Sequence, residues 1–589
     1  MAAVMSSLRQ EDGGPLAVVL QTKARYRLNS LDSLEPEDGT VAQASAAERS
    51  EGAAADLGAA EAGGDNSCDA QPASEASPSE VQQPLLGVRD TLLMTSVSMA
   101  HGVMFSHTFA VVGVVESEWL KTSGVHNFLG NPNLTIGLVG LCAFASLAGP
   151  VVGSISDASR SQHGRRRPVL LVLTGMAWVM TFALSAASGM KSYPLYMTAF
   201  FFHQTSYFAH NAVFTGMMMD FSTPESASLL GGLKLLYLVL GVETGIEVAH
   251  RTRGAAPQVL GGLSALLTLV STLLACWVCK EDISARWTEA PQESLMSSPF
   301  RKLFKGLADS TRHSFGKLAL SRMCATASTA AVACSLWFVQ DMFQRGADDS
   351  DSKSSLTIGM HLFRCGIGAI ALGAGWTTAR LIWKISKVHE PTEEQIEWEM
   401  RRRMNIGCLW MALLWFLVPQ TWHGAQHDFD YWGCSEREVV EEKWSCYLIL
   451  IACFWGIGQG VNLAAGEALS FKLIPRSPHY ALVQGWAYTF LACGAVAGGA
   501  MTGAVMELYA GQIDAASLQL RDREDEMRWK TYTHEICGDA SKMEGRFYRE
   551  KGYEAVCWLA SALLVLSIGV SWLMRLKWTM QSTMQQAAS

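Results

Sequence analysis

Long apolar stretches alternate with short polar segments along most of this chain. From about residue 90 onward, the apolar runs reach about 20 residues, the length at which a helix crosses the ~30 Å hydrocarbon layer of a bilayer. The runs predict spanning helices at 91–114, 134–155, 168–189, 193–218, 227–248, 257–279, 317–341, 357–379, 404–420, 446–470, 480–506 and 554–577. The pattern therefore predicts an all-α membrane protein with twelve transmembrane helices.

The beginning of the chain lacks this pattern. Residues 1–88 are rich in Ala, Ser, Gly, Glu and Asp, and no apolar period is sustained there. Such a segment cannot bury enough surface to offset the entropy lost on ordering. The stretch Leu16–Leu20 is also too short for the apolar core of a secretory signal. We therefore expect a disordered cytosolic tail.

Basic residues set the predicted orientation. Only 17% of the residues are charged, against about a quarter in soluble proteins, and the basic ones gather in particular loops. Loops rich in Lys and Arg stay on the cytosolic side, which places both termini in the cytosol. The loops after the second, sixth and eighth spans hold Arg160, Arg165–Arg167, Lys280, Arg286, Arg301, Lys302, Lys305, Arg312, Arg380, Lys384, Lys387 and Arg401–Arg403.

The spans divide into two sets of six. We expect one six-helix half at 89–280, a basic cytosolic linker at 281–316, a second half at 317–580 and a cytosolic tail at 581–589. This layout is similar to that of the major facilitators, in which two halves rock around a site near the membrane midplane.

The loop between the second and third spans is the most specific segment of the sequence. It reads GSISDASRSQHGRRRP from Gly153 to Pro168, with Asp157 at the end of one span and Arg165–Arg167 before the next. Pro168 opens that next span, where its missing N–H costs a helix nothing. A carboxylate at this place can pair with the guanidinium groups and hold neighbouring helices together.

The pattern G-x-x-S-D-x6-G-R-R-R-P resembles the sucrose–proton symporters of plants and their animal relatives. These belong to the glycoside–pentoside–hexuronide:cation symporter group of the major facilitator superfamily. Three further segments look like the family's: HNAVFTGMMMDFSTPE with Asp220, WFVQDMFQRG with Asp341, and MHLFRCGIGAIALG with Arg364. One position departs from it, because Thr215 stands where the family carries a basic residue implicated in sugar binding. Either another residue replaces it or the substrate differs.

The resemblance and the positions of the charges predict a gate. Asp157 and Asp220 lie at the cytosolic ends of their spans, and contacts with Arg165, Arg166 and Arg167 would hold the cytosolic side closed. The alternative is that the arginines only anchor the topology.

Ionisable residues inside spans are the candidates for proton coupling, because burial in a bilayer is costly without a function. Asp341 and Arg364 would lower each other's cost if they meet, and protonation of Asp341 would break the pair. Glu243 and Glu247 share a helix face, so one of them is a candidate to take up a proton. A permanent ion pair, or a hydrated Glu247, is the alternative.

Polar residues on inner spans are the candidates for substrate binding. His203, Tyr207, His210 and Asn211 fall on one stripe of the fourth span. Imidazole, phenol and amide groups suit sugar hydroxyls, although they also serve as hydrogen bonds between helices. His101, Gln459 and Asn462 complete the predicted set.

The absence of common nucleotide-binding and enzyme motifs narrows the range of possible functions. The sequence has no G-x-x-x-x-G-K-[ST], H-E-x-x-H or G-x-S-x-G pattern, so we expect neither direct ATP use nor enzyme activity, and no cofactor or metal. Most cysteines lie in apolar runs as packing residues. Cys434 and Cys537 fall in predicted extracellular loops and could be bridged.

These observations predict secondary active transport of a sugar or glycoside such as sucrose, coupled to protons. The expected partners are the sugar, protons and the bilayer, with no nucleic acid. The plasma membrane is expected, with a vacuolar or other internal membrane as the alternative. A transporter-like sensor or scaffold that moves nothing is the second interpretation. The choice of sugar, H⁺ against Na⁺, and the oligomeric state stay open.

Overall fold

A computed structural model describes most of the chain beyond the N-terminal tail. The described residues are 88–106, 141–159, 161–190, 192–222, 224–252, 256–279, 303, 306–308, 311, 313–334, 338–339, 342, 349–387, 393–432, 437–474, 479–513, 545–548 and 550–588. The predictions for residues 1–87, for most of the linker, for Asp341 and for the Cys434–Cys537 pair lie outside them.

The described chain is nearly all helix. The helices are α3 (Val88–Thr95), α6 (Ala148–Ala158), α7 (Arg167–Gly189), α8 (Tyr193–Asp220), α9 (Pro224–Thr252), α10 (Ala256–Val278), α12 (His313–Thr329), η3 (Ala330–Cys334), α14 (Asp349–Lys387), α15 (Glu393–Trp415), α16 (Leu417–Trp432), α17 (Arg437–Leu473), α18 (Tyr480–Leu508) and α20 (Glu550–Ala588). Two further helical segments occupy 97–106 and 141–146.

The described residues also include a short two-stranded β-ribbon. Strand β1 (Ala510–Ile513) follows α18 and pairs antiparallel with β2 (Gly545–Tyr548), which precedes α20, so that Ala510 lies opposite Tyr548. The predicted all-α class is thus confirmed for the helical body, and the ribbon joins two of its helices.

Nine helices among the described residues are long and apolar enough to cross a bilayer, judged by length and composition. They coincide with all the predicted spans except 91–114, 193–218 and 317–341. The first and last of these exceptions run partly outside the described residues. The other corresponds to α8, which is 28 residues long but carries several polar side chains. The total of twelve stays a prediction.

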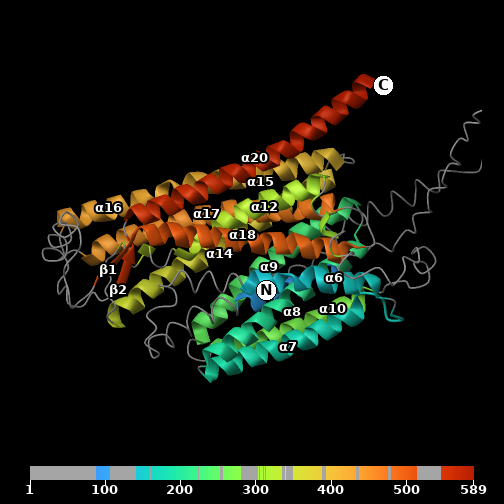
Figure 1. Cartoon of the computed structure of the whole chain (residues 1–589), viewed down its shortest axis with the longest axis horizontal. Helices are drawn as coiled ribbons and strands as arrows, with labels where there is room; N and C mark the ends of the chain where they lie inside the picture. The colour runs from blue at the N-terminus through green and yellow to red at the C-terminus, as the bar shows by residue number, and fades with distance from the viewer. Residues whose placement is uncertain are drawn as a thin grey trace, which may run out of the picture. The chain divides into compact units, whose positions relative to one another are not determined.

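The helices gather into two sets (Figure 1). Helices α6 to α10 and segment 97–106 come from the first predicted half, and α12 to α20 come from the second. Neighbours within the first set include α7 with α8 and α7 with α10, and neighbours within the second include α14 with α17 and α12 with α20. Helix α9 crosses to α14 and α17, while α6 and α8 cross to α18. These crossings form the joint between the halves.

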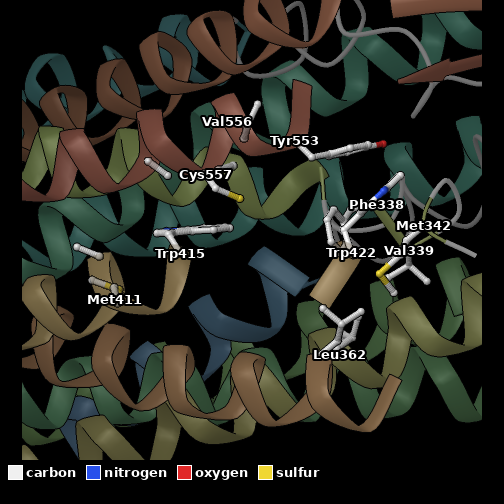
Figure 2. Close-up of a cluster of buried hydrophobic side chains, with 14 of the residues drawn as sticks. Phe338, Val339, Met342, Leu362, Met411, Trp415, Trp422, Tyr553, Val556 and Cys557 are labelled. Atoms are coloured by element: carbon white, nitrogen blue, oxygen red, sulfur yellow. The ribbon is translucent and has the colours of Figure 1, made fainter. Parts of the chain in front are cut away.

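The second half has an aromatic core (Figure 2). Phe338 meets Trp422 and Tyr553 edge-on at ring separations of 5.4 and 5.3 Å, and Trp422 stacks on Tyr553. Edge-to-face rings are favoured because the ring edge is positive and the ring face negative. Buried Met411, Trp415 and Val556 extend the cluster and fix α15, α16 and α20 relative to one another.

Two glycines shape the joint at the loop singled out in the sequence. Gly164, between α6 and α7, has a φ of 96°, a conformation that side chains with a Cβ rarely adopt. It turns the chain so that α7 begins at the following arginines. Gly153 of α6 lets two backbones meet, because a Cβ there would lie 2.6 Å from the carbonyl of Ala481 in α18.

Candidate functional site

The arginines of the loop between α6 and α7 fold inward. Arg166 is completely buried, forms an ion pair with Asp157 and donates from Nε to Asp220 at 3.0 Å. Arg165 donates to the other oxygen of Asp220 at 2.5 Å. The sequence analysis predicted these four residues together with Arg167 as a gate, and the structure brings the four together. Their role as a gate stays a prediction.

The third arginine has a different partner. Arg167 donates to the backbone carbonyl of Cys279, at the end of α10. A basic side chain at a helix C-terminus is favoured by the unpaired carbonyls and the helix dipole there. Arg167 therefore ties α7 to α10 within the first half.

Asp157 also reaches the other half of the molecule. Its second carboxylate oxygen accepts the backbone N–H of Leu482, near the start of α18, at 3.0 Å. We call the end of the bundle that holds Asp157 and Arg165–Arg167 the arginine end. The hydrogen bond to Leu482 and the close approach at Gly153 close this end between α6 and α18.

A second charged cluster lies deeper in the joint. Lys234 of α9 donates to Glu467 of α17 at 2.8 Å, and Arg322 of α12 donates to the other oxygen of Glu467 at 2.8 Å. Arg322 also donates to the hydroxyl of Ser470 at 2.6 Å. The three charged side chains are at most 8% exposed. Lys234 comes from the first half and its partners from the second, so this cluster spans the joint.

Tyr488 of α18 extends this cluster to α8. Its phenol oxygen accepts from Lys234 and lies 3.1 Å from the hydroxyl of Thr215. Each hydroxyl also has another acceptor within reach, the carbonyl of Asn211 for Thr215 and the carboxylate of Glu467 for Tyr488, so either can be the donor between them. A basic side chain thus lies one hydrogen-bonded residue away from Thr215, where the family resemblance expected one. That side chain is Lys234 of α9, the helix that follows α8.

The sequence analysis did not select Lys234 or Arg322. The signal was present, because both are cations inside predicted spans, where charges are costly and need partners. Their partner Glu467 sits far away in the sequence, so only the folded chain shows which charges meet. The cluster of two cations and one carboxylate carries a formal excess of one positive charge.

Two of the predicted substrate residues pair with each other. His101 Nε2 and His210 Nδ1 are 2.7 Å apart, and the other nitrogen of His210 lies 3.1 Å from the hydroxyl of Thr174 and 3.2 Å from that of Thr272. Tyr207 contacts His101 edge-on. His210 therefore lies among segment 97–106, α7 and α10 of its own half.

The remaining predicted substrate residues are all buried but are not gathered in one place. His203 and Asn211 lie on the same helix as His210. Asn462 donates to the carbonyl of Met404 and to Cys408 of α15, within the second half. Gln459 has a buried amide oxygen without a hydrogen-bond partner among the described residues. Their contact with a substrate stays a prediction.

The predicted proton-coupling residues that the structure describes lie toward the far end of α9. Glu247 pairs with Arg364 of α14 across the joint and with Arg251 one turn further along α9 at 2.6 Å. Glu243 has one buried carboxylate oxygen without a hydrogen-bond partner among the described residues. Arg364, predicted to meet Asp341, thus meets Glu247, and Asp341 lies outside the described residues.

A cavity of about 150 Å³ lies inside the second half. Phe338, Trp415, Trp455 and Tyr553 are among its lining residues, and none of the described charged side chains contributes to the lining. This apolar cavity does not suit a polar solute, so the polar clusters in the joint are the better candidate site. Among the described residues, no group of three or more His, Cys, Asp or Glu side chains is placed to hold a metal ion.

Several solved structures have an architecture similar to this one. The human organic anion transporter MFSD10 (TETRAN) matches with a TM-score of 0.52 and 14% identity over 83% of this chain and 100% of that one. A bacterial homologue of the iron transporter ferroportin, in an outward-facing state, matches with a TM-score of 0.50 and 10% identity over 82% of this chain and 99% of that one. The chain has the major facilitator fold. No family model and no curated protein matches its sequence.

The likeness in fold limits what can be concluded about function. These structural neighbours are major facilitator transporters, and together with the apolar helices they indicate that this chain is a multi-pass membrane protein with that fold. At such low identity the likeness extends to the fold and not to the solutes of the neighbours. The solute must be argued from the residues of this chain.

Proposed function

We propose that this chain is a secondary active transporter that carries a sugar or glycoside together with a proton by alternating access. The observation that carries the proposal is the ion pair between Lys234 and Glu467, which joins the two halves in a buried position. Charges are costly at such a place, and in a fold of two rocking halves they mark the pathway and its switch. In this proposal the arginine end is the cytosolic face.

The ion pairs are distributed so that the arginine end can open at low cost. If the halves part there, Asp157 loses Leu482 but keeps Arg166, and Glu467 loses Lys234 but keeps Arg322. No carboxylate is left without a cation, which avoids the large penalty of a single buried charge. Lys234 alone loses its carboxylate. The state of the gate is therefore linked to the electrostatics around Lys234.

The groups near the joint suit a hydroxyl-rich solute. Tyr488 and Thr215 sit beside Lys234, and Tyr207 and His101 face each other on the neighbouring side of the first half. Phenol, hydroxyl and imidazole groups both donate and accept, as sugar hydroxyls do. The Gly153–Pro168 segment, which resembles the sucrose–proton symporters, supports the same substrate class.

Transport by the purified full-length chain in liposomes tests the proposal. We expect labelled disaccharides, with sucrose among them, to accumulate when the external pH is below the internal pH, and an uncoupler to abolish this accumulation. Lys443→Gln, at an exposed pair remote from the joint, is the control variant and should accumulate sugar like the wild type. Absence of both accumulation and sugar exchange would contradict transport and favour a sensor or scaffold.

A further inference from the structure

Besides linking helices of the first half, the histidine pair is a buried titratable group. His101 and His210 are both fully buried, and their rings meet at an interplanar angle of 82° with nitrogens 2.7 Å apart. Two imidazoles at this distance share one proton between them. A further proton on either ring would make the pair a cation, and histidine is the side chain that makes this change near neutral pH.

The hydrogen bonds around the pair allow two arrangements of its protons, and one of them leaves a free acceptor. Thr174 donates its hydroxyl proton to the carbonyl of Leu170 and can accept from His210 Nε2, whereas Thr272 at the same nitrogen can donate to it in the other tautomer. When neutral His210 donates from Nε2 to Thr174, it accepts at Nδ1 and His101 donates from Nε2. This leaves Nδ1 of His101 as a bare acceptor, and it has no hydrogen-bond partner among the described residues.

Among the described residues, no carboxylate forms a hydrogen bond with either imidazole ring. One cation, Lys234, lies near the pair. Thr174 of α7 and Thr272 of α10 face His210, while Tyr207 and Phe214 of α8 face His101. Segment 97–106 packs backbone against backbone on α9, where a Cβ on Gly241 would meet the carbonyl of Met99. Lys234 lies on the same helix two turns away, close enough for its charge to act on His101.

We propose that the His101–His210 pair holds the co-transported proton, bound to Nδ1 of His101, while Lys234 is paired with Glu467, and releases it when that pair separates. This inference rests on the proposed function and names the proton site within it. The proton adds to the lone pair of Nδ1 and leaves to water, and no other bond forms or breaks.

Charge balance gives the direction of this coupling. While the arginine end is closed, Glu467 offsets part of the charge of Lys234, so that a proton on His101 meets less repulsion than it would beside Lys234 alone. When the halves part, His101 and Lys234 stay together in the first half, and Glu467 leaves with the second. The uncompensated ammonium then disfavours the imidazolium, and the proton is released toward the open arginine end.

The same nitrogen links the proton to the solute. Protonation turns Nδ1 of His101 from an acceptor into a charged donor, which binds an oxygen more strongly than a neutral donor does. Nδ1 of His101 has no protein partner among the described residues. It can therefore bind a water molecule or a solute hydroxyl once the end of the bundle opposite the arginine end opens. Sugar and proton then favour each other's binding, as symport requires.

Separate measurements of accumulation and exchange on the liposome-reconstituted protein test this inference. His101→Gln keeps a hydrogen-bonding side chain but cannot hold the proton. We expect its accumulation ratio of labelled sugar to fall to 1 under a pH gradient, and exchange against unlabelled sugar to slow because the charged donor to the solute is lost. Sugar-dependent proton entry, followed with a trapped pH dye, should vanish. His163→Gln, an exposed histidine of the loop after α6, is the matched control and should behave as wild type.

A second variant keeps the inference testable if His101→Gln does not fold. Lys234→Met removes the cation near the pair, so the pH of half-maximal accumulation should rise by about one unit. An unchanged pH midpoint in Lys234→Met, or full accumulation in His101→Gln, would overturn the inference. Loss of accumulation in Glu243→Gln with full retention in His101→Gln would place the proton on α9 instead. Wild-type protein without any sugar exchange would contradict the proposed function itself.

Discussion

The carboxylate of Asp157 in α6 accepts the backbone N–H of Leu482 in α18, across the joint between the two halves. The same carboxylate pairs with the fully buried Arg166. One side chain thus belongs both to the charge cluster of its own half and to the contact that closes the arginine end. Opening of this end must break the hydrogen bond and leaves the ion pair intact.

Asp157→Asn should loosen the arginine end. The amide oxygen can still accept from Leu482, but its weaker charge no longer holds Arg166 in place. We expect a thiol introduced by Leu482→Cys, where the native side chain is buried, to be alkylated several-fold faster when Asp157→Asn is also present. Asp428→Asn is the control, since it is the same chemical change far from this contact. Equal alkylation rates in both backgrounds would refute this gate.

The central cluster should respond unequally to loss of its members. Glu467→Gln leaves Lys234 and Arg322 buried without a carboxylate and should destabilise the protein by about 3–5 kcal/mol. Lys234→Met leaves Arg322 paired with Glu467 and should cost clearly less. Thermal unfolding in detergent measures both variants. A larger loss for Lys234→Met than for Glu467→Gln would contradict the pairing that we describe.

Gly153 should not tolerate even one added methyl group. A Cβ there meets the backbone of Ala481 at 2.6 Å, so Gly153→Ala must push α6 away from α18 and should cost about 1–3 kcal/mol. Gly175 in α7 has no atom within 4 Å of its Cβ position, and Gly175→Ala should be neutral or stabilise by up to about 1 kcal/mol. Unfolding temperatures of the two variants decide the matter. Equal temperatures would show that the helices are not in close contact at Gly153.

The ion pair at the far end of α9 should contribute little. Glu247 and Arg364 are 28% and 26% exposed, so solvent screens them, and Arg364→Gln should cost less than about 1 kcal/mol. Glu247 keeps Arg251 as a partner in this variant. Thermal unfolding beside Glu467→Gln provides the comparison. A loss as large as that of Glu467→Gln would show that this pair is more buried than described.

Asp428 of α16 should make stability depend on pH only in acid. Lys443 and Trp444 donate to one of its carboxylate oxygens at 2.6 and 2.8 Å, and the hydrogen bond from Lys443 holds the pKa of Asp428 below its ordinary value. The contribution to stability is complete above the unfolded pKa of about 3.9 and is lost as the pH falls through the lower folded pKa.

The difference in unfolding temperature between wild type and Asp428→Asn measures this contribution. It should be constant from neutral pH down to about 5 and should shrink below about 4. A difference that changes between pH 5 and 8 would assign the effect to another group.

Much of the architecture could be predicted from the sequence because a bilayer requires it. Apolar runs of spanning length predicted the helices, and α7, α10 and α18 begin and end within a few residues of the predicted spans. The loop at Gly153–Pro168 also indicated a charge cluster, which the structure shows with Asp220 in it. Its residues are close in sequence or lie at span ends, so their meeting follows from topology.

The partners of charges inside the spans could not be predicted in this way. The sequence suggested Asp341 as the partner of Arg364, and the structure shows Glu247 at Arg364, while Asp341 lies outside the described residues. His210 and Asn211 share a predicted stripe, but His210 is held by threonines of α7 and α10. A helical period places residues on a face without stating which neighbouring helix that face meets.

By itself, the sequence determined that this chain crosses a membrane as helices, because backbone polar groups in lipid must be satisfied within each segment. It also determined that charge gathers where α6 gives way to α7. Only the tertiary structure decided that Lys234, Arg322 and Glu467 form one cluster and that His101 bonds His210. These contacts join helices that are distant in the chain, and the packing of small residues such as Gly153 sets which helices approach closely enough to form them.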